Sequence, residues 1–129
     1  SVLDFGGGDK AQYSSWLKCQ SYKSVNIDPM ISPTWVIDIN KVLPCADNSF
    51  DSVISFNTLE HIYDVSSALN EMKRVLKSDG ELFLITPFLH PIHGHPNDFF
   101  RPTGSWYKET LIKLGFQKIE VISQKKLIN

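Results

Sequence analysis

Apolar and polar positions along the chain follow two patterns, one typical of strands and one typical of helices. The change from one pattern to the other marks the boundaries of the expected elements. Short apolar runs that are rich in β-branched and aromatic residues, and that end near a glycine, a proline or an acid, predict strands. The predicted strands cover residues 1–5, 24–28, 35–39, 51–56, 81–86 and 116–123. Between them, apolar residues that recur every three or four positions predict helices over residues 11–19, 64–77 and 105–114.

The order of these elements indicates the fold class. Strands that alternate with helices through short connections form right-handed βαβ units, so we expect an α/β fold with a doubly wound, mostly parallel, Rossmann-like sheet. The sequence contains no internal repeat or linker, which predicts a single domain over residues 1–129. In such sheets a ligand binds beyond the carboxyl ends of the strands, where the strand order reverses. Functional residues are therefore expected just after each strand.

A glycine-rich turn follows the first predicted strand. In VLDFGGGDKA, the residues from Gly6 to Ala11 are spaced as G-x-G-x-x-A, which is typical of nucleotide-binding turns because glycine lets the backbone approach the ligand. Asp28 comes about twenty residues later and is suited to accept hydrogen bonds from a ribose diol. Lys10 lacks the spacing and the following Ser or Thr of a P-loop. NAD and S-adenosylmethionine both fit this part of the pattern.

Two further acids favour S-adenosylmethionine over a dinucleotide. Asp4 lies two residues before the first glycine, where dinucleotide sites usually have an apolar residue, and its carboxylate is suited to hold a ligand ammonium. Asp38 comes near the end of the third predicted strand, where its carboxylate can accept a hydrogen bond from an adenine amino group. The backbone N–H of Ile39 can donate to a ring nitrogen. A second acidic strand end is less expected for NAD.

Four segments, in this order and spacing, resemble the class I S-adenosylmethionine-dependent methyltransferases. They read VLDFGGG, NIDPM, DINKVLPCADNSFDSVISFNTLEHI and ALNEMKRVLKSDGELFLITPF. The resemblance implies that S-adenosylmethionine is the cofactor and that the reaction is methyl transfer. It implies these cofactor-binding residues: Asp4, Gly6 and Gly8 in the first motif, Asp28 at the ribose, Asp38 and Ile39 at the adenine, and Asn57 at the methionine moiety.

The chain also departs from the pattern of the family it resembles. Members of that family usually have a helix before the first strand and a seventh, antiparallel strand after the sixth, and we expect both to be missing here. The domain is therefore expected to be trimmed or incomplete at both ends. Two alternatives stay open at this point: a non-catalytic module that binds S-adenosylmethionine, and an NAD-dependent oxidoreductase.

The stretch PFLHPIHGHPNDFFRPT after the fifth predicted strand is the candidate source of the chemistry. A base is optional for methyl transfer, but a hydroxyl or amine acceptor would benefit from one. We expect His93 and His95 to be catalytic, because the glycine between them lets the chain turn one imidazole towards the site. The same two histidines could reach one ion, yet the prolines favour a loop over the acceptor site, and no metal is expected.

The neighbours of these histidines have simpler predicted roles. Asp98 and Arg101 are expected to form an internal salt bridge. Phe99, Phe100 and Trp106 are expected either to offer apolar or stacking surface to the acceptor or to belong to the core. Glu60 and His61, which follow the fourth predicted strand, are expected to hydrogen-bond within their own turn.

Composition adds little beyond the class of protein. A net charge of −1 and 42% hydrophobic residues are typical of an ordinary globular domain. The charge gives no support to nucleic acid as a partner and weakly favours a small-molecule acceptor. Cys19 and Cys45 lack metal-ligand spacing and are expected to be reduced thiols, which, with the absence of a long apolar run, favours a cytoplasmic protein without a membrane partner. Oligomeric state is not predicted.

Overall fold

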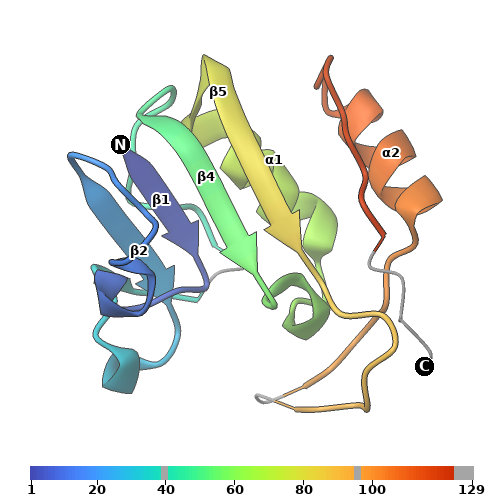
Figure 1. Ribbon diagram of the computed structural model, residues 1–129, viewed down its shortest axis with the longest axis horizontal. Helices are drawn as coiled ribbons and strands as arrows, with labels where there is room; N and C mark the ends of the chain where they lie inside the picture. The colour runs from blue at the N-terminus through green and yellow to red at the C-terminus, as the bar shows by residue number, and fades with distance from the viewer. Residues whose placement is uncertain (39–40, 95–96, 124–129) are drawn as a thin grey trace.

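Five parallel strands form one sheet in the computed structural model, which describes residues 1–38, 41–94 and 97–123 (Figure 1). The spatial order of the strands is β3-β2-β1-β4-β5. Their bounds are β1 Val2–Phe5, β2 Tyr22–Asn26, β3 Trp35–Val36, β4 Phe50–Phe56 and β5 Leu76–Ile85. The parallel α/β sheet expected from the sequence is confirmed.

The strand order reverses at β1, and this reversal sets the place of the site. The chain runs outwards from β1 through β2 to β3, then crosses back to pair β4 with the other side of β1. Val2 is opposite Tyr22 on one side and Ser52 on the other, in parallel register. Connections that leave β1 and β4 therefore diverge at the carboxyl end of the sheet and open a crevice there.

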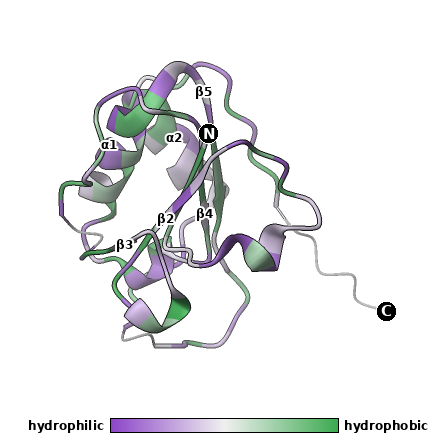
Figure 2. Ribbon diagram, turned by 90° about the vertical axis from the view of Figure 1, so that its left-hand side faces the viewer, coloured by the Kyte–Doolittle hydropathy of each residue, from purple (hydrophilic) through white to green (hydrophobic). Residues whose placement is uncertain are grey.

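Two helices and three 3₁₀ turns connect the strands. The helices are α1 Val65–Val75 and α2 Gly104–Lys113, and the 3₁₀ turns are η1 Lys10–Tyr13, η2 Pro29–Ile31 and η3 Leu59–His61. Figure 2 shows α1 and α2 on the same side of the sheet. None of the helices described is both long enough and apolar enough to cross a membrane.

Helix α1 begins where the sequence predicts and supplies the main core contact. The Asp64 side chain caps it by accepting a hydrogen bond from the backbone N–H of Ser67 at 3.1 Å. One stripe of α1 is buried, and it consists of Val65, Ala68, Leu69, Met72 and Val75. This stripe belongs to the same buried cluster as Leu3, Phe5 and Val53 of the sheet. Burying each large side chain contributes about 1.5–3 kcal/mol, so the α1 face anchors the half of the sheet that carries the site.

The helix predicted over residues 11–19 is wrong. Only the 3₁₀ turn η1 forms there, capped by the Asp9 side chain, which accepts from the N–H of Ala11. Trp16, whose apolar surface should have anchored a helix, is 56% exposed, and its ring contacts those of Tyr13 and Phe56. A short amphipathic segment needs tertiary packing to stay helical, and this one receives little.

Two strand predictions need correction. Residues 116–123 are described but form no strand, because the chain leaves α2 through Gly115 at φ +94° and the N–H of Phe116 turns back to the carbonyl of Leu111. Strand β5 begins at Leu76, five residues before the predicted start. An irregularity in the pairing with β4, between Phe50 and Ser52, absorbs the extra residues.

Candidate functional site

The glycine turn after β1 is shaped by close approaches that leave no room for side chains. Gly6 has φ +94°, and a Cβ atom there would overlap Thr58. A Cβ on Gly7 would overlap the carboxylate of Asp4, and one on Gly8 would overlap the backbone carbonyl of Ile31. With glycine at all three positions, no side chain of these residues stands between a ligand and the backbone of the turn.

A cleft of about 590 Å³ lies directly above this turn. We call it the cofactor cleft, and it is lined by Asp4, Gly6, Gly7, Gly8, Asp9, Ala11, Gln12, Tyr13, Ile31, Phe56 and Asn57. Its volume is in the range of pockets that enclose a small ligand. The carboxyl ends of β1 and β4 form its floor, which is the position that the strand order predicts.

Asp4 is the buried acid of the cofactor cleft. Its side chain is 1% exposed, and one carboxylate oxygen accepts a hydrogen bond from the Tyr22 hydroxyl at 2.5 Å. Burial raises the pKa of Asp4 to about 6, and the bond from Tyr22 lowers it in part. A cationic ligand group would offset the cost of keeping this carboxylate ionised.

Asn57 joins Asp4, Gly6 and Gly8 in the cofactor cleft. It follows β4 directly and has φ +53°, a left-handed conformation that is uncommon for a residue other than glycine. Its backbone N–H donates to the carbonyl of Ile85 at 2.7 Å, which fixes the end of β4 against β5. Strained backbone of this kind is often found at ligand sites.

The predicted ribose and adenine acids are not among the residues that line the cleft. Asp28 is exposed and caps η2, where its side chain accepts from the N–H of Met30 at 2.9 Å. Asp38 follows β3 by two residues, is half-buried, and its carbonyl accepts from the N–H of Lys41 at 3.0 Å. Ile39, the other half of the predicted adenine pair, lies outside the described residues. The roles of all three at the cofactor remain predictions.

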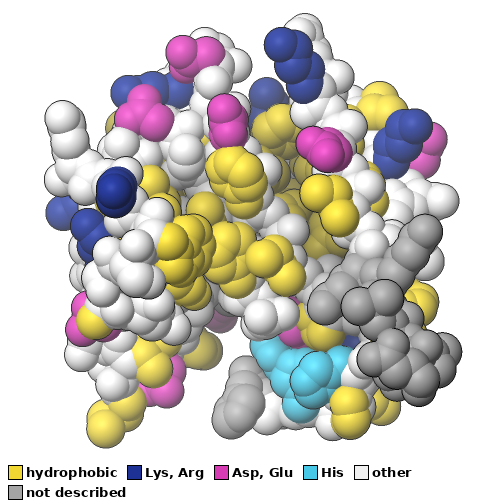
Figure 3. All heavy atoms as spheres, in the orientation of Figure 1, with side chains coloured by type: hydrophobic (Ala, Val, Ile, Leu, Met, Phe, Trp, Pro, Cys, Tyr) yellow, Lys and Arg dark blue, Asp and Glu magenta, His cyan; other side chains and the backbone are white. Residues whose placement is uncertain are grey.

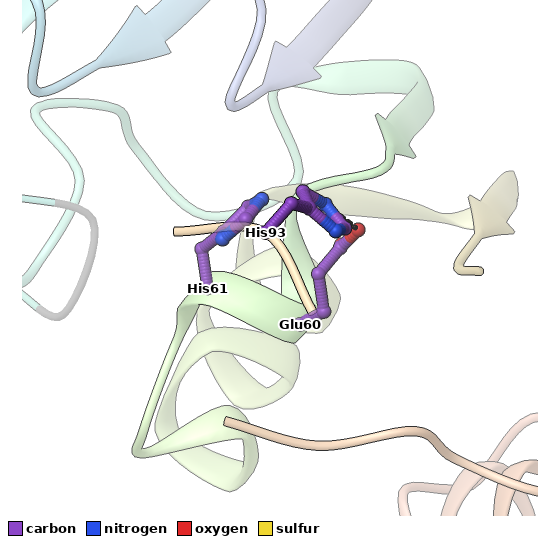
Figure 4. A group of neighbouring side chains, drawn as sticks. All are labelled: Glu60, His61 and His93. Carbon is purple, nitrogen blue, oxygen red and sulfur yellow. Dashed lines mark ion pairs between the residues drawn. The ribbon is translucent and has the colours of Figure 1, made fainter. Parts of the chain in front are cut away.

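A second cluster of polar side chains lies at the same end of the sheet, after β4 and β5. Histidine side chains gather there in Figure 3, and Figure 4 shows Glu60 and His61 on η3 with His93 reaching them from the loop after β5. We call Glu60, His61 and His93 the histidine cluster, because one donor atom from each lies within 4.8 Å of the others. The sequence placed His93 at the site but expected Glu60 and His61 only to bond within their turn.

Glu60 is the unusual member of the histidine cluster. Its side chain is fully buried, and within the described residues neither carboxylate oxygen has a hydrogen-bond partner. Its Oε2 lies 3.5 Å from the Nε2 of His93. Burying an ionised carboxylate without partners costs on the order of several kcal/mol, so this group needs a counter-charge.

The loop that carries His93 is held by a confirmed salt bridge. Both Asp98 carboxylate oxygens accept from the Arg101 guanidinium, at 2.5 and 2.7 Å, and this pairing holds the pKa of Asp98 well below its usual range. The backbone N–H of His93 donates to Asp98 at 2.9 Å. His95, the other predicted catalytic histidine, lies outside the described residues.

The aromatic residues predicted to cover the acceptor line a second, smaller cavity. It has a volume of about 350 Å³, and its lining includes Phe99, Phe100 and Trp106 together with the start of α1. Phe100 and Trp106 meet edge to face and also pack against the core. The sequence left open whether these rings serve as ligand surface or core; Phe100 and Trp106 pack against the core, and all three rings line the cavity.

Comparison with known proteins identifies the family to which the chain belongs. Residues 3–84 match the family described as "Methyltransferase domain", and the chain belongs to this family of class I S-adenosylmethionine-dependent methyltransferases. The fit of the cofactor is supported by the glycine turn, which a Cβ atom would fill, and by the buried Asp4 carboxylate, which suits the charged end of S-adenosylmethionine. Membership of this family confirms S-adenosylmethionine as the cofactor predicted from the sequence. It gives no support to the alternative of an NAD-dependent oxidoreductase.

One relative and two solved structures show how similar known proteins are to this chain in sequence and in fold. Demethylmenaquinone methyltransferase of Corynebacterium efficiens is 35% identical over 88 residues, which cover 68% of this chain and 35% of that protein. A chain from a complex with the Haloferax volcanii Trm112 methyltransferase activator has a TM-score of 0.73 at 20% identity, covering 88% of this chain and 59% of that one.

The [4+2]-cyclase SpnF has the same fold, with a TM-score of 0.70 at 19% identity, covering 92% of this chain and 52% of that one. The fold alone therefore does not define the reaction. This chain also spans only about a fifth to a third of the length of the curated relatives that it matches, from 19% to 36%.

Proposed function

We propose that this protein transfers the methyl group of S-adenosylmethionine to a small-molecule acceptor. The observation that carries the proposal is the cofactor cleft, in which Asp4, the three glycines and Asn57 meet at the crevice of a methyltransferase-family sheet. The cofactor supplies an activated methyl group on a positively charged sulfur. The protein then has to hold the acceptor in line with that group, because correct positioning provides much of the rate.

The histidine cluster is the proposed acceptor end of the site. Its first member, Glu60, follows Asn57 by three residues along the chain, and the cluster lies at the same end of the sheet as the cofactor cleft. His93 and His95 remain our catalytic candidates, with His93 argued from its position and His95 from the sequence alone. Both ring nitrogens of His93 face oxygen atoms, so His93 is less accessible as a general base than a histidine in open solvent.

A small acceptor is supported by two observations. The Corynebacterium relative is named for a small-molecule substrate, and the net charge of −1 gives no general electrostatic support to nucleic acid as an acceptor. Demethylmenaquinone is therefore the first acceptor to test.

Calorimetry with S-adenosylhomocysteine tests the cofactor part of the proposal. We expect a Kd of about 1–100 µM, equivalent to about 5.5–8 kcal/mol, and no heat with NADH. Binding of NADH but not S-adenosylhomocysteine would refute the proposal.

Transfer of a radiolabelled methyl group from S-adenosylmethionine to demethylmenaquinone that has first been reduced to its nucleophilic hydroquinone, and then to a panel of small hydroxyl and amine compounds, tests turnover. Labelled product is the expected result. Binding without transfer to any acceptor in the panel would favour a non-catalytic S-adenosylmethionine-binding module.

A further inference from the structure

The histidine cluster has the composition and arrangement of a metal site. We propose that Glu60, His61 and His93 bind a divalent transition-metal cation, and that this cation holds a hydroxyl group of the methyl acceptor. The first half of the proposal concerns cation binding alone. The second half rests on the proposed methyl transfer.

The buried carboxylate is the first reason. Glu60 is fully buried, yet within the described part of the chain neither of its oxygens is hydrogen-bonded. Figure 4 shows it directed towards His93, whose Nε2 lies 3.5 Å from its Oε2. A protonated His93 could pair with one oxygen only. A cation between Glu60 and two neutral imidazoles would supply the missing counter-charge without protonating either ring.

The outer contacts of the two imidazoles are the second reason. His61 Nδ1 lies 2.5 Å from the carbonyl oxygen of Asn97, so this nitrogen carries the proton and Nε2 keeps its lone pair. His93 Nδ1 lies 3.1 Å from the carbonyl oxygen of Pro91 and 3.4 Å from Oδ2 of Asp98, which again leaves Nε2 as the free donor atom. Histidines that bind metals usually donate their other N–H to a carbonyl or carboxylate in this way.

The spacing of the donor atoms is close to that of a bound cation. Ligands about 2.0–2.2 Å from a tetrahedral cation lie about 3.4 Å apart. The Glu60–His93 pair already has this separation, at 3.5 Å, and all three donor atoms lie within 4.8 Å of one another. Closing the longest of these separations, at most 4.8 Å, to about 3.4 Å needs side-chain movements that add up to about 1.4 Å or less.

The ligand types indicate the kind of cation and its use. Two imidazoles and one carboxylate favour first-row transition metals over Mg²⁺ or Ca²⁺, which prefer oxygen ligands. Three protein ligands leave a coordination position open. A hydroxyl oxygen bound there would lose its proton to solvent more readily. Its lone pair would then form the new O–CH₃ bond while the S–CH₃ bond breaks, and the electron pair of that bond would return to sulfur.

Titration of metal-free protein with Co²⁺ tests the first half. We expect one equivalent to bind, with a visible absorption band that Zn²⁺ removes by competition. The variants Glu60→Gln and His93→Ala should bind Co²⁺ at least about tenfold more weakly, since even loss of an outer partner has an effect of this size. His90→Ala is the matched control, because His90 lies in the same loop but outside the cluster.

Either of two outcomes would overturn the proposal: no Co²⁺ binding by the parent protein, or unchanged binding in both ligand variants. Should Glu60→Gln fail to fold, His61→Gln at a half-buried position carries the same test. The open position is tested with azide, which should shift the cobalt band. A cobalt site that does not respond to azide overturns the acceptor half.

S-adenosylhomocysteine binding, measured on the same metal-free protein, separates this inference from the proposed function. Cofactor binding without Co²⁺ binding refutes the metal site and leaves methyl transfer standing. Co²⁺ binding without cofactor binding refutes the proposed function and supports the cation site alone.

Discussion

The two polar regions at the carboxyl end of the sheet are built in different ways. The cofactor cleft contains three glycines whose side-chain positions are occupied by neighbours, and most of its lining comes from the end of β1 and the turn that follows it. The histidine cluster is formed entirely by side chains, two from η3 and one from the distant loop after β5. The first shape is therefore fixed locally, whereas the second depends on how one loop packs against another.

Each region contains one buried carboxylate, and their surroundings differ. Asp4 in the cofactor cleft accepts a hydrogen bond from Tyr22, whereas Glu60 in the histidine cluster has no such partner within the described residues. A buried acid lowers stability until a ligand compensates it. A bound cation or cationic group would compensate an ionised carboxylate in either region, and only Glu60 of the two lacks a hydrogen-bond partner among the described residues.

The largest expected effect comes from filling the glycine turn. Gly8→Ala should weaken S-adenosylhomocysteine binding by at least about 100-fold, or about 2.7 kcal/mol, because the new Cβ overlaps the carbonyl of Ile31 and moves the cleft wall. Calorimetry measures the loss. Gly104→Ala is the matched control, since its Cβ would come only to 3.2 Å from a methyl group of Val121. Equal affinity in both variants would show that the turn does not shape the cleft.

The difference between the two regions also explains what the sequence could predict. The glycine turn, Asp4 and Asn57 lie beside strand ends, so their meeting in one cleft follows from the parallel sheet alone. The pairing of Glu60 with His93 depends on the path of the loop after β5, which no repeat or spacing encodes. The predicted helix over residues 11–19 failed for a related reason, because its pattern was right but its packing partner is lacking.

The second effect is a pH dependence of stability at Asp4. Its folded pKa is about 6 against an ordinary value of 3.8, so the folded state holds a proton that the unfolded state releases over this interval. The free energy of unfolding should therefore fall as pH rises from about 4 to 6, by about 3 kcal/mol in total. Asp4→Asn removes this titration and should gain that amount over the parent protein between pH 4 and pH 7.

Urea unfolding of both proteins at several pH values measures the Asp4 contribution as a difference, which cancels the other carboxylates. Tyr22→Phe sharpens the test, because loss of the hydroxyl that donates to Asp4 should raise the Asp4 pKa further and extend the fall in stability to higher pH. A constant difference between the parent and Asp4→Asn across this range would contradict the assignment.

The smallest expected effect separates the two roles of Asp28. Its side chain caps η2 by accepting from the N–H of Met30, and the family resemblance predicts that it also accepts from the cofactor ribose. Asparagine caps turns and helices about as well as aspartate. Asp28→Asn should therefore keep the melting temperature but weaken S-adenosylhomocysteine binding by about 1.5 kcal/mol, or about tenfold, through loss of a charged acceptor.

Asp28→Ala completes this comparison, because alanine removes the cap and the acceptor together. If Asp28 binds the ribose, both variants lose affinity and only the alanine variant also loses stability, by about 1 kcal/mol. If Asp28 is a cap alone, Asp28→Asn behaves like the parent protein in both measurements. Because Asp28 is exposed and lies outside the residues that line the cofactor cleft, that second result would confine cofactor binding to the floor formed by the ends of β1 and β4.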